Sequence, residues 1–422
     1  MNRKLTIANH RLEYALLSDV GLVRSMNQDA VAAAVAGSEE VWQQRGHVFV
    51  VADGMGAHAA GELASKLAVD TLPLSYQKHR WRPPPDALRK AVHDANARIY
   101  ARATANEEFR GMGTTLSALV LVPQGALIAH VGDSRVYRLR DGTLQQLTFD
   151  HSLVWEVCEA EGITEDEVPA YIPRNVITRS VGSRPEVEVD MEGPFPLQSG
   201  DTFLLCSDGL TARTRDQELG TILGCLAPGE AVQALVDLAI TRGGQDNVSA
   251  IVVRYDQTEG TPQSTNPAPS SAKLPGAAYL WAGLSAAVFA AAGSLVWGPP
   301  AALAGGAVGA LVAIVAAAIH RHAHATWPRR LDGRPLGRGP YTTCPCPPDQ
   351  QAAQLFDATV RQLQEVAQAE NWPIDWPRFN ALADQARAAA SSGDYCGAVR
   401  RSCQIITMVV DQTRTDRRET AG

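Results

Sequence analysis

The sequence lacks two features that would indicate nucleic-acid binding or secretion: an excess of basic residues and an apolar N-terminal run. Its 38 Lys and Arg stand against 45 Asp and Glu in 422 residues, a formal net charge of −7, whereas nucleic-acid-binding domains carry a basic patch or stripe. Residues 1–14 alternate charged and isolated apolar positions, without the continuous apolar core of a secretory signal. We therefore expect no nucleic-acid partner and an N-terminal domain that stays in the cytosol.

Cysteine is also scarce. Seven scattered cysteines, an odd number, do not form a disulfide framework, and this fits a reducing compartment. Cys344, Cys346, Cys396 and Cys403 offer four thiolates to zinc, although their spacings are not those of known zinc motifs. Cys206 lies inside an apolar run and is expected to be a small core residue.

Changes in composition along the chain predict five segments. The first mixes short β-type runs, glycine turns and helical stretches at 61–72 and 85–104, which indicates an α/β domain. The second is rich in Thr, Ser and Pro and has almost no large apolar residue, so it is expected to be flexible. In chain order the segments are an α/β domain at 1–256, a linker at 257–276, a two-span transmembrane hairpin at 277–319, a basic Pro/Gly-rich connector at 320–348 and a helical tail at 349–422.

The expected hairpin consists of two uncharged runs. Ala277 through Trp297 would extend roughly 32 Å as a helix, which matches the thickness of a bilayer core. Gly298-Pro299-Pro300 interrupts it, and Ala301 through Ile319 is again uncharged. Arginines and histidines follow the second run, so the positive-inside rule places both flanks in the cytosol at the cytoplasmic membrane. Because Ala and Gly are only weakly hydrophobic, a buried soluble helix pair is the alternative.

The tail has helical periodicity. Apolar residues recur three or four apart in the series Leu355, Phe356, Val360, Leu363 and Val366. Further helical stretches follow near 379–390 and 395–410, and Ser392-Gly393-Asp394 breaks the last two. Such a helical hairpin is similar to one unit of a helical-repeat module that binds a protein partner. A small bundle that caps or dimerises the protein is the alternative.

Three aspartates stand beside short apolar runs. Asp53 and Asp208 each follow one run, and Asp246 comes just before another. The runs are rich in β-branched residues and predict buried strands. If the strand after Asp246 is antiparallel to the other two, the three carboxylates gather at one rim of a sheet. Mg²⁺ and Mn²⁺ prefer such oxygen ligands.

These aspartates belong to a longer series of motifs. In this order the series closely resembles the metal-dependent serine/threonine protein phosphatases of type 2C (the PPM family), in their bacterial form. Each motif alone is weak, since Asp-Gly is an ordinary turn, but the whole series is specific and extends roughly from residue 14 to residue 254. The motifs are Arg24–Asp29, Asp53–His58, Gly111–Thr115, Gly132–Arg135, Leu147–Ser152, Ser207–Leu210 and Gly243–Asn247.

The resemblance implies an α/β fold and a metal centre. The fold is a four-layer sandwich of two antiparallel β-sheets flanked by helices, to which this chain adds the transmembrane hairpin and the small all-α tail. Two Mn²⁺ or Mg²⁺ ions are implied in a cleft at one edge. Asp53 would bridge both ions, the carbonyl of Gly54 would bind the second, and Asp208 and Asp246 would hold the first.

Two further ligands follow from the same resemblance. Asp29 would act mainly through metal-bound water, and Asp133 would share a third, weaker ion with Asp208. Each aspartate also has a simpler interpretation as a turn or capping residue. Asp133, in Gly-Asp-Ser-Arg, could simply be a residue of a tight turn.

The implied chemistry is hydrolysis of phosphoserine and phosphothreonine in proteins that a serine/threonine kinase has modified. A water that bridges two divalent ions is acidic enough to supply hydroxide as the nucleophile at cellular pH. Arg24 would clamp the phosphate, because a guanidinium matches its geometry, or would only form a surface ion pair. His58 would protonate the leaving group. The alternatives are that metal-bound water supplies this proton and that His58, as a loop histidine, only bonds backbone. His151 is interpreted as structural.

Two other functions are alternatives to this one. A pseudophosphatase would use the same fold as a sensor, or as a scaffold through the helical tail, but it would have little need for the complete ligand set. A nuclease would need a basic surface that the sequence lacks. Residues 154–175 correspond to the variable flap and are rich in Glu, so we expect basic or neutral phosphopeptides to be preferred.

Overall fold

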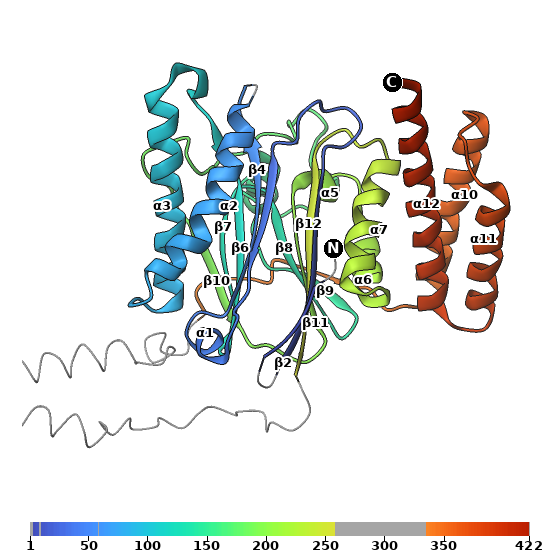
Figure 1. Ribbon diagram of the computed structural model, residues 1–422, viewed down its shortest axis with the longest axis horizontal. Helices are drawn as coiled ribbons and strands as arrows, with labels where there is room; N and C mark the ends of the chain where they lie inside the picture. Colours follow the sequence, from blue (N-terminus) through green and yellow to red (C-terminus); the bar gives the residue numbers. More distant parts are fainter. Residues whose placement is uncertain (1–2, 8–9, 58, 258–334, 422) are drawn as a thin grey trace, which may run out of the picture. The chain divides into compact units, whose positions relative to one another are not determined.

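The computed structural model describes residues 3–7, 10–57, 59–257 and 335–421 (Figure 1). Residues 1–80, 84–259 and 334–422 form one compact unit, and a second unit comprises 81–83 and 260–333. The expected hairpin at 277–319, nearly all of the linker and the first part of the connector lie outside the described residues. Among the helices that are described, none is both long and apolar enough to cross a bilayer.

The strands form two sheets, and every described strand pair is antiparallel. The first sheet has the order β1 (Arg3–Ile7), β2 (His10–Asp19), β12 (Val248–Gln257), β11 (Asp201–Cys206), β8 (Arg135–Arg140), β9 (Thr143–Gln146) and β13 (Thr342–Pro345). The second has the order β10 (Asp190–Phe195), β7 (Gly125–Val131), β6 (Leu116–Val122), β4 (His47–Met55) and β3 (Asp29–Ala34), with β5 (Gly113–Thr114) paired to β4.

Helices cover the outer faces of both sheets. In Figure 1, α2 and α3 lie on the second sheet, and α6 and α7 lie on the first. The remaining short helices lie in the connecting loops. The bounds in the α/β domain are α1 (Glu39–Gln44), α2 (Ala60–Lys78), α3 (Pro84–Ala105), η1 (Glu107–Phe109), α4 (Leu153–Glu161), η2 (Glu165–Glu167), α5 (Asp208–Thr211), α6 (Asp216–Cys225) and α7 (Pro228–Thr241).

The four layers share an apolar interior, and the predicted sandwich is confirmed. Phe49 of β4 and Phe203 of β11 are fully buried in a cluster between the two sheets. Burial of such side chains contributes about 1.5–3 kcal/mol each. Cys206 is also fully buried, in the cluster on the other face of the first sheet, as expected of a core residue.

Helix α2 is longer than the sequence predicts. The expected stretch ends at Leu72, and the next residue, Pro73, lacks a helical donor. The helix nevertheless continues to Lys78, because its buried face continues as well. Tyr76 is fully buried, and its hydroxyl donates to the carbonyl of Arg45 at 3.1 Å.

The tail is helical, as predicted, and it packs on the α/β domain. Its helices are α10 (Gln350–Ala369), α11 (Trp376–Ser391) and α12 (Tyr395–Ala421). Gly393, with φ of +83°, follows the end of α11, a backbone conformation that glycine adopts without strain. Phe356, Val399 and Ile406 share one buried cluster with Leu223 and Leu235 of α6 and α7. The tail therefore extends the core of the α/β domain.

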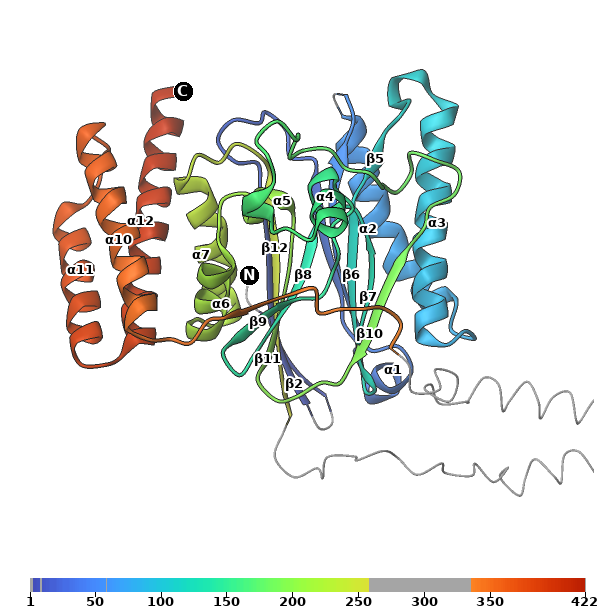
Figure 2. The ribbon, with the colours of Figure 1, turned by 180° about the vertical axis from the view of Figure 1, so that it is seen from behind.

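The connector contains a strand that the sequence does not predict. Figure 2 shows the chain crossing the back of the sandwich before it reaches the tail helices. Residues of β13 pair with β9, as in Thr342↔Gln146 and Cys344↔Leu144. Cys346 is buried against Gly220 of α6, where an added Cβ would overlap its sulfur. No group of three or more His, Cys, Asp or Glu side chains in the described part of the chain is placed to hold a metal, so the four thiolates considered for zinc do not converge.

Candidate active site

The expected carboxylates lie at the strand ends of both sheets. Asp29 and Asp53 are directly opposite each other in the antiparallel pair of β3 and β4. Asp208 follows β11 and opens α5, and Asp246 precedes β12. β11 and β12 are antiparallel neighbours, as expected, but β4 belongs to the second sheet. The expectation of one sheet rim is therefore wrong. The candidate site spans the ends of two packed sheets, and Asp133 lies in the turn between β7 and β8.

Hydroxyl groups fix the backbone and side chains at this junction. The amide of Asp53 donates to the hydroxyl of Thr115, and the amide of Thr115 donates to the carbonyl of Asp53, both at 2.8 Å. The hydroxyl of Ser207 donates to Oδ2 of Asp29 at 2.7 Å. Ser207 follows β11 of the first sheet, while Asp29 begins β3 of the second, so this bond joins the two sheets at the site.

The electrostatics show carboxyl groups crowded together. Burial raises the pKa of Asp53 well above its ordinary value, and the negative charges of Asp29, Asp208 and Asp133 raise it further. The pKa values of those three aspartates are raised too, in each case first by burial. Like charges so placed disfavour ionisation unless a cation compensates them.

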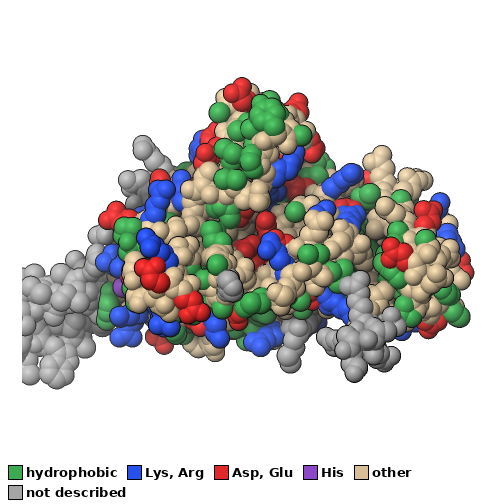
Figure 3. All heavy atoms as spheres, turned by 90° about the horizontal axis from the view of Figure 1, so that it is seen from above, with side chains coloured by type: hydrophobic (Ala, Val, Ile, Leu, Met, Phe, Trp, Pro, Cys, Tyr) green, Lys and Arg blue, Asp and Glu red, His purple; other side chains and the backbone are tan. Residues whose placement is uncertain are grey.

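Buried carboxylate oxygens without hydrogen-bond partners indicate whether divalent ions fit this site. The Oδ1 atoms of Asp29, Asp133 and Asp208 are buried and accept no hydrogen bond, which is costly for a carboxylate without a cation or donor. Oxygen-only ligands of this kind suit Mg²⁺ and Mn²⁺. The donor set therefore fits these ions chemically, although in the described residues no three acidic side chains enclose a common ion position. Figure 3, which looks down on the strand ends, shows acidic side chains within the hollow near the centre.

Arg24 lies beside Asp246. Its Nη2 is 2.9 Å from Oδ2 of the aspartate, and both side chains are about half exposed. This hydrogen bond and the charge of Asp246 raise the pKa of Arg24. The Arg24 loop is held by Asn247, whose side chain donates to the carbonyls of Val20 and Met26, each at 3.0 Å. Arg24 is thus held at the edge of the carboxylate group with its guanidinium reachable from solvent.

Gly54 lies where two segments approach closely. An added Cβ would overlap the carbonyl of Gly61 at the start of α2, so no larger residue fits without a shift. Its amide donates to the carbonyl of Gln28 at 3.0 Å. His58, the expected proton donor, lies outside the described residues.

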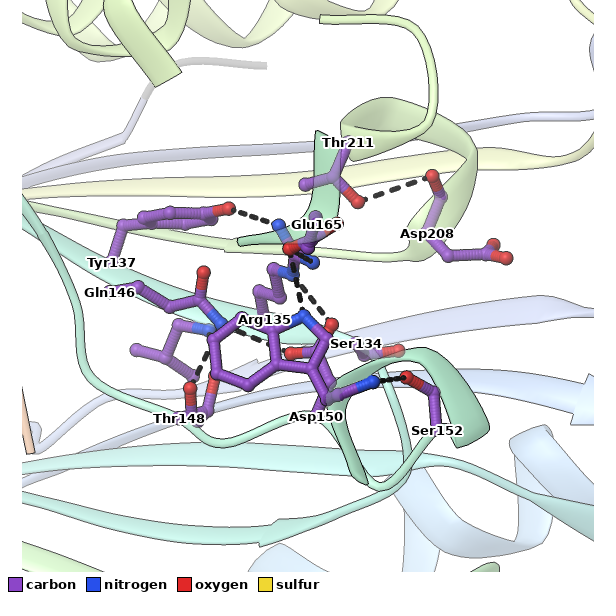
Figure 4. A network of polar contacts seen from close by, with 12 residues as sticks. Ser134, Arg135, Tyr137, Gln146, Thr148, Asp150, Ser152, Glu165, Asp208 and Thr211 are labelled. Carbon is purple, nitrogen blue, oxygen red and sulfur yellow. Dashed lines mark hydrogen bonds and ion pairs between the residues drawn. The ribbon is translucent and has the colours of Figure 1, made fainter. Parts of the chain in front are cut away.

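Arg135 links the turn of Asp133 to the flap (Figure 4). Its Nε donates to Asp150 at 2.8 Å and its Nη2 donates to Glu165 of η2 at 2.7 Å. The indole of Trp155 in α4 donates to the same Glu165 oxygen at 2.8 Å, and the guanidinium lies 5.4 Å from the Trp155 ring centre. Arg135 is 13% exposed, and breaking a buried ion pair of this kind typically costs about 3–5 kcal/mol.

His151 holds the other side of the same turn. Its Nδ1 accepts a hydrogen bond from the amide of Gly132 at 3.0 Å, and its Nε2 is 3.0 Å from Asp190. The acceptor role of Nδ1 places the ring proton on Nε2. Gly132 has φ of +111°, a conformation that glycine tolerates. His151 therefore fixes the backbone one residue before Asp133, in keeping with the structural interpretation.

Residues 23–238, slightly more than half of the chain, match the family model described as protein phosphatase 2C. The chain belongs to the protein phosphatase 2C family. The resemblance stated from the motifs is confirmed, and with it the enzyme class, a protein-serine/threonine phosphatase.

The relatives of this phosphatase match its α/β domain. A protein phosphatase 2C-type protein of Streptococcus pyogenes is 38% identical over 253 residues, which are 59% of this chain and 99% of the relative. The crystal structure of the Mycobacterium tuberculosis serine/threonine phosphatase PstP/Ppp is similar with a TM-score of 0.51 and 35% identity, over 58% of this chain and 98% of that one. A structure of the PstP catalytic domain in complex with two manganese ions has a TM-score of 0.50 and 34% identity, over 58% and 99%.

The sequence interpretation missed several residues that position this site. Arg135 and Asn247 lie inside the quoted motifs, next to predicted ligands, and their place beside Asp133 and Asp246 is the one local signal that could have singled them out. Thr115 also lies in a quoted motif, but neither it nor Glu165 stands beside a predicted ligand, and their partners are distant in sequence.

Proposed function

We propose that this phosphatase hydrolyses phosphoserine and phosphothreonine with two Mn²⁺ or Mg²⁺ ions bound at the junction of the sheets. Asp53, the carbonyl of Gly54, Asp208 and Asp246 would hold the two ions, with Asp29 acting through water. A third, weaker ion would bind Asp133 and the shared Asp208. The observation that carries the proposal is the set of buried carboxylate oxygens without partners at Asp29, Asp133 and Asp208.

The ions, when bound, would supply an activated water and neutralise the phosphate charge. Residues of the chain would orient the phosphate, position the ligands and donate the proton. Arg24 is within reach of both Asp246 and solvent, so its guanidinium can exchange that partner for a substrate phosphate and orient it. Ser207 and Thr115 keep Asp29 and Asp53 in place while the charge of the substrate changes. By the family resemblance, His58 would protonate the departing seryl or threonyl oxygen.

We also propose that residues 277–319 tether the enzyme to the cytoplasmic membrane, with the catalytic domain and the tail in the cytosol. The support is the two uncharged runs, with no charge in the turn between them, and the basic residues that follow. Fractionation of cells that express the full chain tests this proposal. We expect the protein in the membrane fraction until detergent is added, and its recovery in the soluble fraction without detergent would contradict the tether.

The catalytic proposal is tested by phosphate release from a phosphothreonine peptide. We expect the full-length protein in detergent to release phosphate with Mn²⁺ and to lose this activity on chelation. A folded wild-type protein that releases no phosphate with Mn²⁺ would contradict the proposal and favour the scaffold alternative.

A further inference from the structure

A groove leads from the candidate metal ligands to the C-terminal extension, by which we mean residues 335–421. Its volume is about 1460 Å³, and its lining begins at Asp133 and Asp208 and ends at the connector and α10. Pockets that bind small molecules typically enclose about 300–1,000 Å³, so this groove exceeds what a phosphorylated side chain alone would fill. The flap lies on one side of it and the segment of α5 and α6 on the other.

The connector is attached firmly to the catalytic domain along this groove. Strand β13 continues the first sheet beyond β9. The hydroxyl of Tyr341 donates to Glu192 of β10, and its ring lies 5.5 Å from that of Phe149. Arg338 forms an ion pair with Glu159 of the flap helix at 3.0 Å. The connector therefore contacts both the sheet edge and the flap.

The helical part of the extension is also attached to the catalytic domain. The guanidinium of Arg400 donates to the carbonyl of Cys225 at 3.0 Å, and Arg414 forms an ion pair with Asp19 at 2.6 Å. These contacts attach α12 to the catalytic domain, and Phe356 of α10 shares the apolar cluster with both. The extension thus forms a fixed wall, which needs no ordering when a substrate binds.

The catalytic domain and the extension line the groove with different chemistry. The catalytic domain contributes charged groups, among them Asp150, Arg174 and Arg215. Every residue that the extension contributes is uncharged; these include Tyr341, Thr342, Leu355, Ala358 and Thr359. A wall of this kind suits uncharged side chains of an extended polypeptide better than an ion. The streptococcal relative is matched over 99% of its length by 59% of this chain, so two fifths of this chain lie outside that match.

We propose that the C-terminal extension completes the substrate site, and that its uncharged wall binds an uncharged part of the polypeptide that flanks the phosphorylated residue. This proposal rests on the proposed phosphatase function. It is supported by the continuity of the groove with the candidate metal ligands and by its size. The extension would then select among phosphoproteins by their flanking sequence, while the catalytic domain would still accept a bare phosphate ester.

The test compares two tryptophan substitutions on α10 of the full-length protein. Ala358→Trp places a large side chain in the groove, whereas Ala369→Trp adds the same side chain at an exposed alanine that does not line it. The substrates are p-nitrophenyl phosphate, a phosphothreonine peptide of about five residues and one of about fifteen with uncharged flanks, extended over roughly 50 Å. Ala358→Trp is expected to raise KM for the long peptide at least about fivefold, the equivalent of roughly 1 kcal/mol. We expect kcat/KM for the two short substrates to stay close to wild type.

The possible outcomes distinguish a failure of this proposal from a failure of the proposed phosphatase function. If the wild-type enzyme hydrolyses none of the three substrates, the proposed phosphatase function is wrong. If the wild-type enzyme is active but Ala358→Trp and Ala369→Trp have the same KM for the long peptide, only the proposed role of the wall is wrong. A uniform loss on all three substrates would also overturn it, because the wall would then support the catalytic centre instead of the substrate. Gln362→Trp, at a second exposed position of the same wall, is expected to repeat the selective effect.

Discussion

Arg135 donates from Nη2 to Oε1 of Glu165 at 2.7 Å, and this contact ties the flap to the turn that carries Asp133. The two residues are thirty positions apart, and the indole of Trp155 donates to the same carboxylate oxygen. One guanidinium therefore joins the flap to the turn that carries a candidate metal ligand.

Removal of the charge at Glu165 should loosen the flap. In Glu165→Gln the ion pair with Arg135 is lost, and because Glu165 is 41% exposed the free energy of unfolding should fall by only about 1 kcal/mol. Limited proteolysis should cleave the flap sooner, and KM for a phosphopeptide should rise. Glu161→Gln, at an exposed position at the end of α4, is the matched control. Equal protease resistance in the two variants would contradict the role assigned to Glu165.

Loss of the His151 ring should disturb the turn that carries Asp133. His151→Ala leaves the amide of Gly132 without its acceptor and removes a buried ring, so we expect a loss of about 2–4 kcal/mol in the free energy of unfolding. The Mn²⁺ concentration needed for half-maximal activity should rise as well. Denaturant unfolding and a Mn²⁺ titration of activity measure the two effects. An unchanged Mn²⁺ requirement would show that this ring does not position the Asp133 turn.

The partner of His151 predicts a dependence of stability on pH. Burial alone would raise the pKa of Asp190, but hydrogen bonds from His151 and Arg179 and the charge of Arg179 outweigh it and lower that pKa to about 2. A carboxyl group with a lowered folded pKa stabilises the protein above its unfolded pKa, and this contribution is lost as the pH falls through the folded value. The difference in unfolding free energy between wild type and Asp190→Asn should therefore shrink as the pH falls from about 5 to about 1, through the unfolded and then the folded pKa. A difference that stays constant over this range would contradict the assigned pKa.

The continuous core predicts that the tail and the catalytic domain unfold together. Ile406 of α12 is fully buried in the cluster that includes Leu235 of α7. Ile406→Ala should lower the free energy of unfolding by about 2–5 kcal/mol. Heat inactivation and loss of helical circular dichroism should shift to lower temperature by the same amount, whereas Thr415→Ala, at an exposed position near the end of α12, should shift neither. Inactivation at the wild-type temperature, with earlier melting of the helices, would show a separately folded tail.

The fold and the candidate ligands were predictable because their signals are local. Asp53, Asp208 and Asp246 stand directly beside apolar strands, and each motif is complete within a few residues. The helices of the tail follow from periodicity, and the break near Gly393 from its backbone freedom.

The parts that could not be predicted depend on contacts between distant residues. Strand β13 has four residues and gains its hydrogen bonds from β9, nearly two hundred positions earlier. Two carboxylates of the flap are paired with arginines outside it, Glu159 with Arg338 and Glu165 with Arg135. Neither partner is visible in the local sequence.

The most direct test of the account is the rate of phosphate release by full-length Asp53→Asn across a Mn²⁺ titration, with Asp70→Asn, an exposed aspartate on α2, as the matched control. We predict that Asp70→Asn behaves as wild type. Asp53→Asn should lose at least about 100-fold in rate, more than is typical when a residue that only supports a ligand is changed. It should remain folded, because one of several repelling buried carboxylates is removed. Release of phosphate by a folded Asp53→Asn at the wild-type rate, with the wild-type Mn²⁺ requirement, would contradict the central claim.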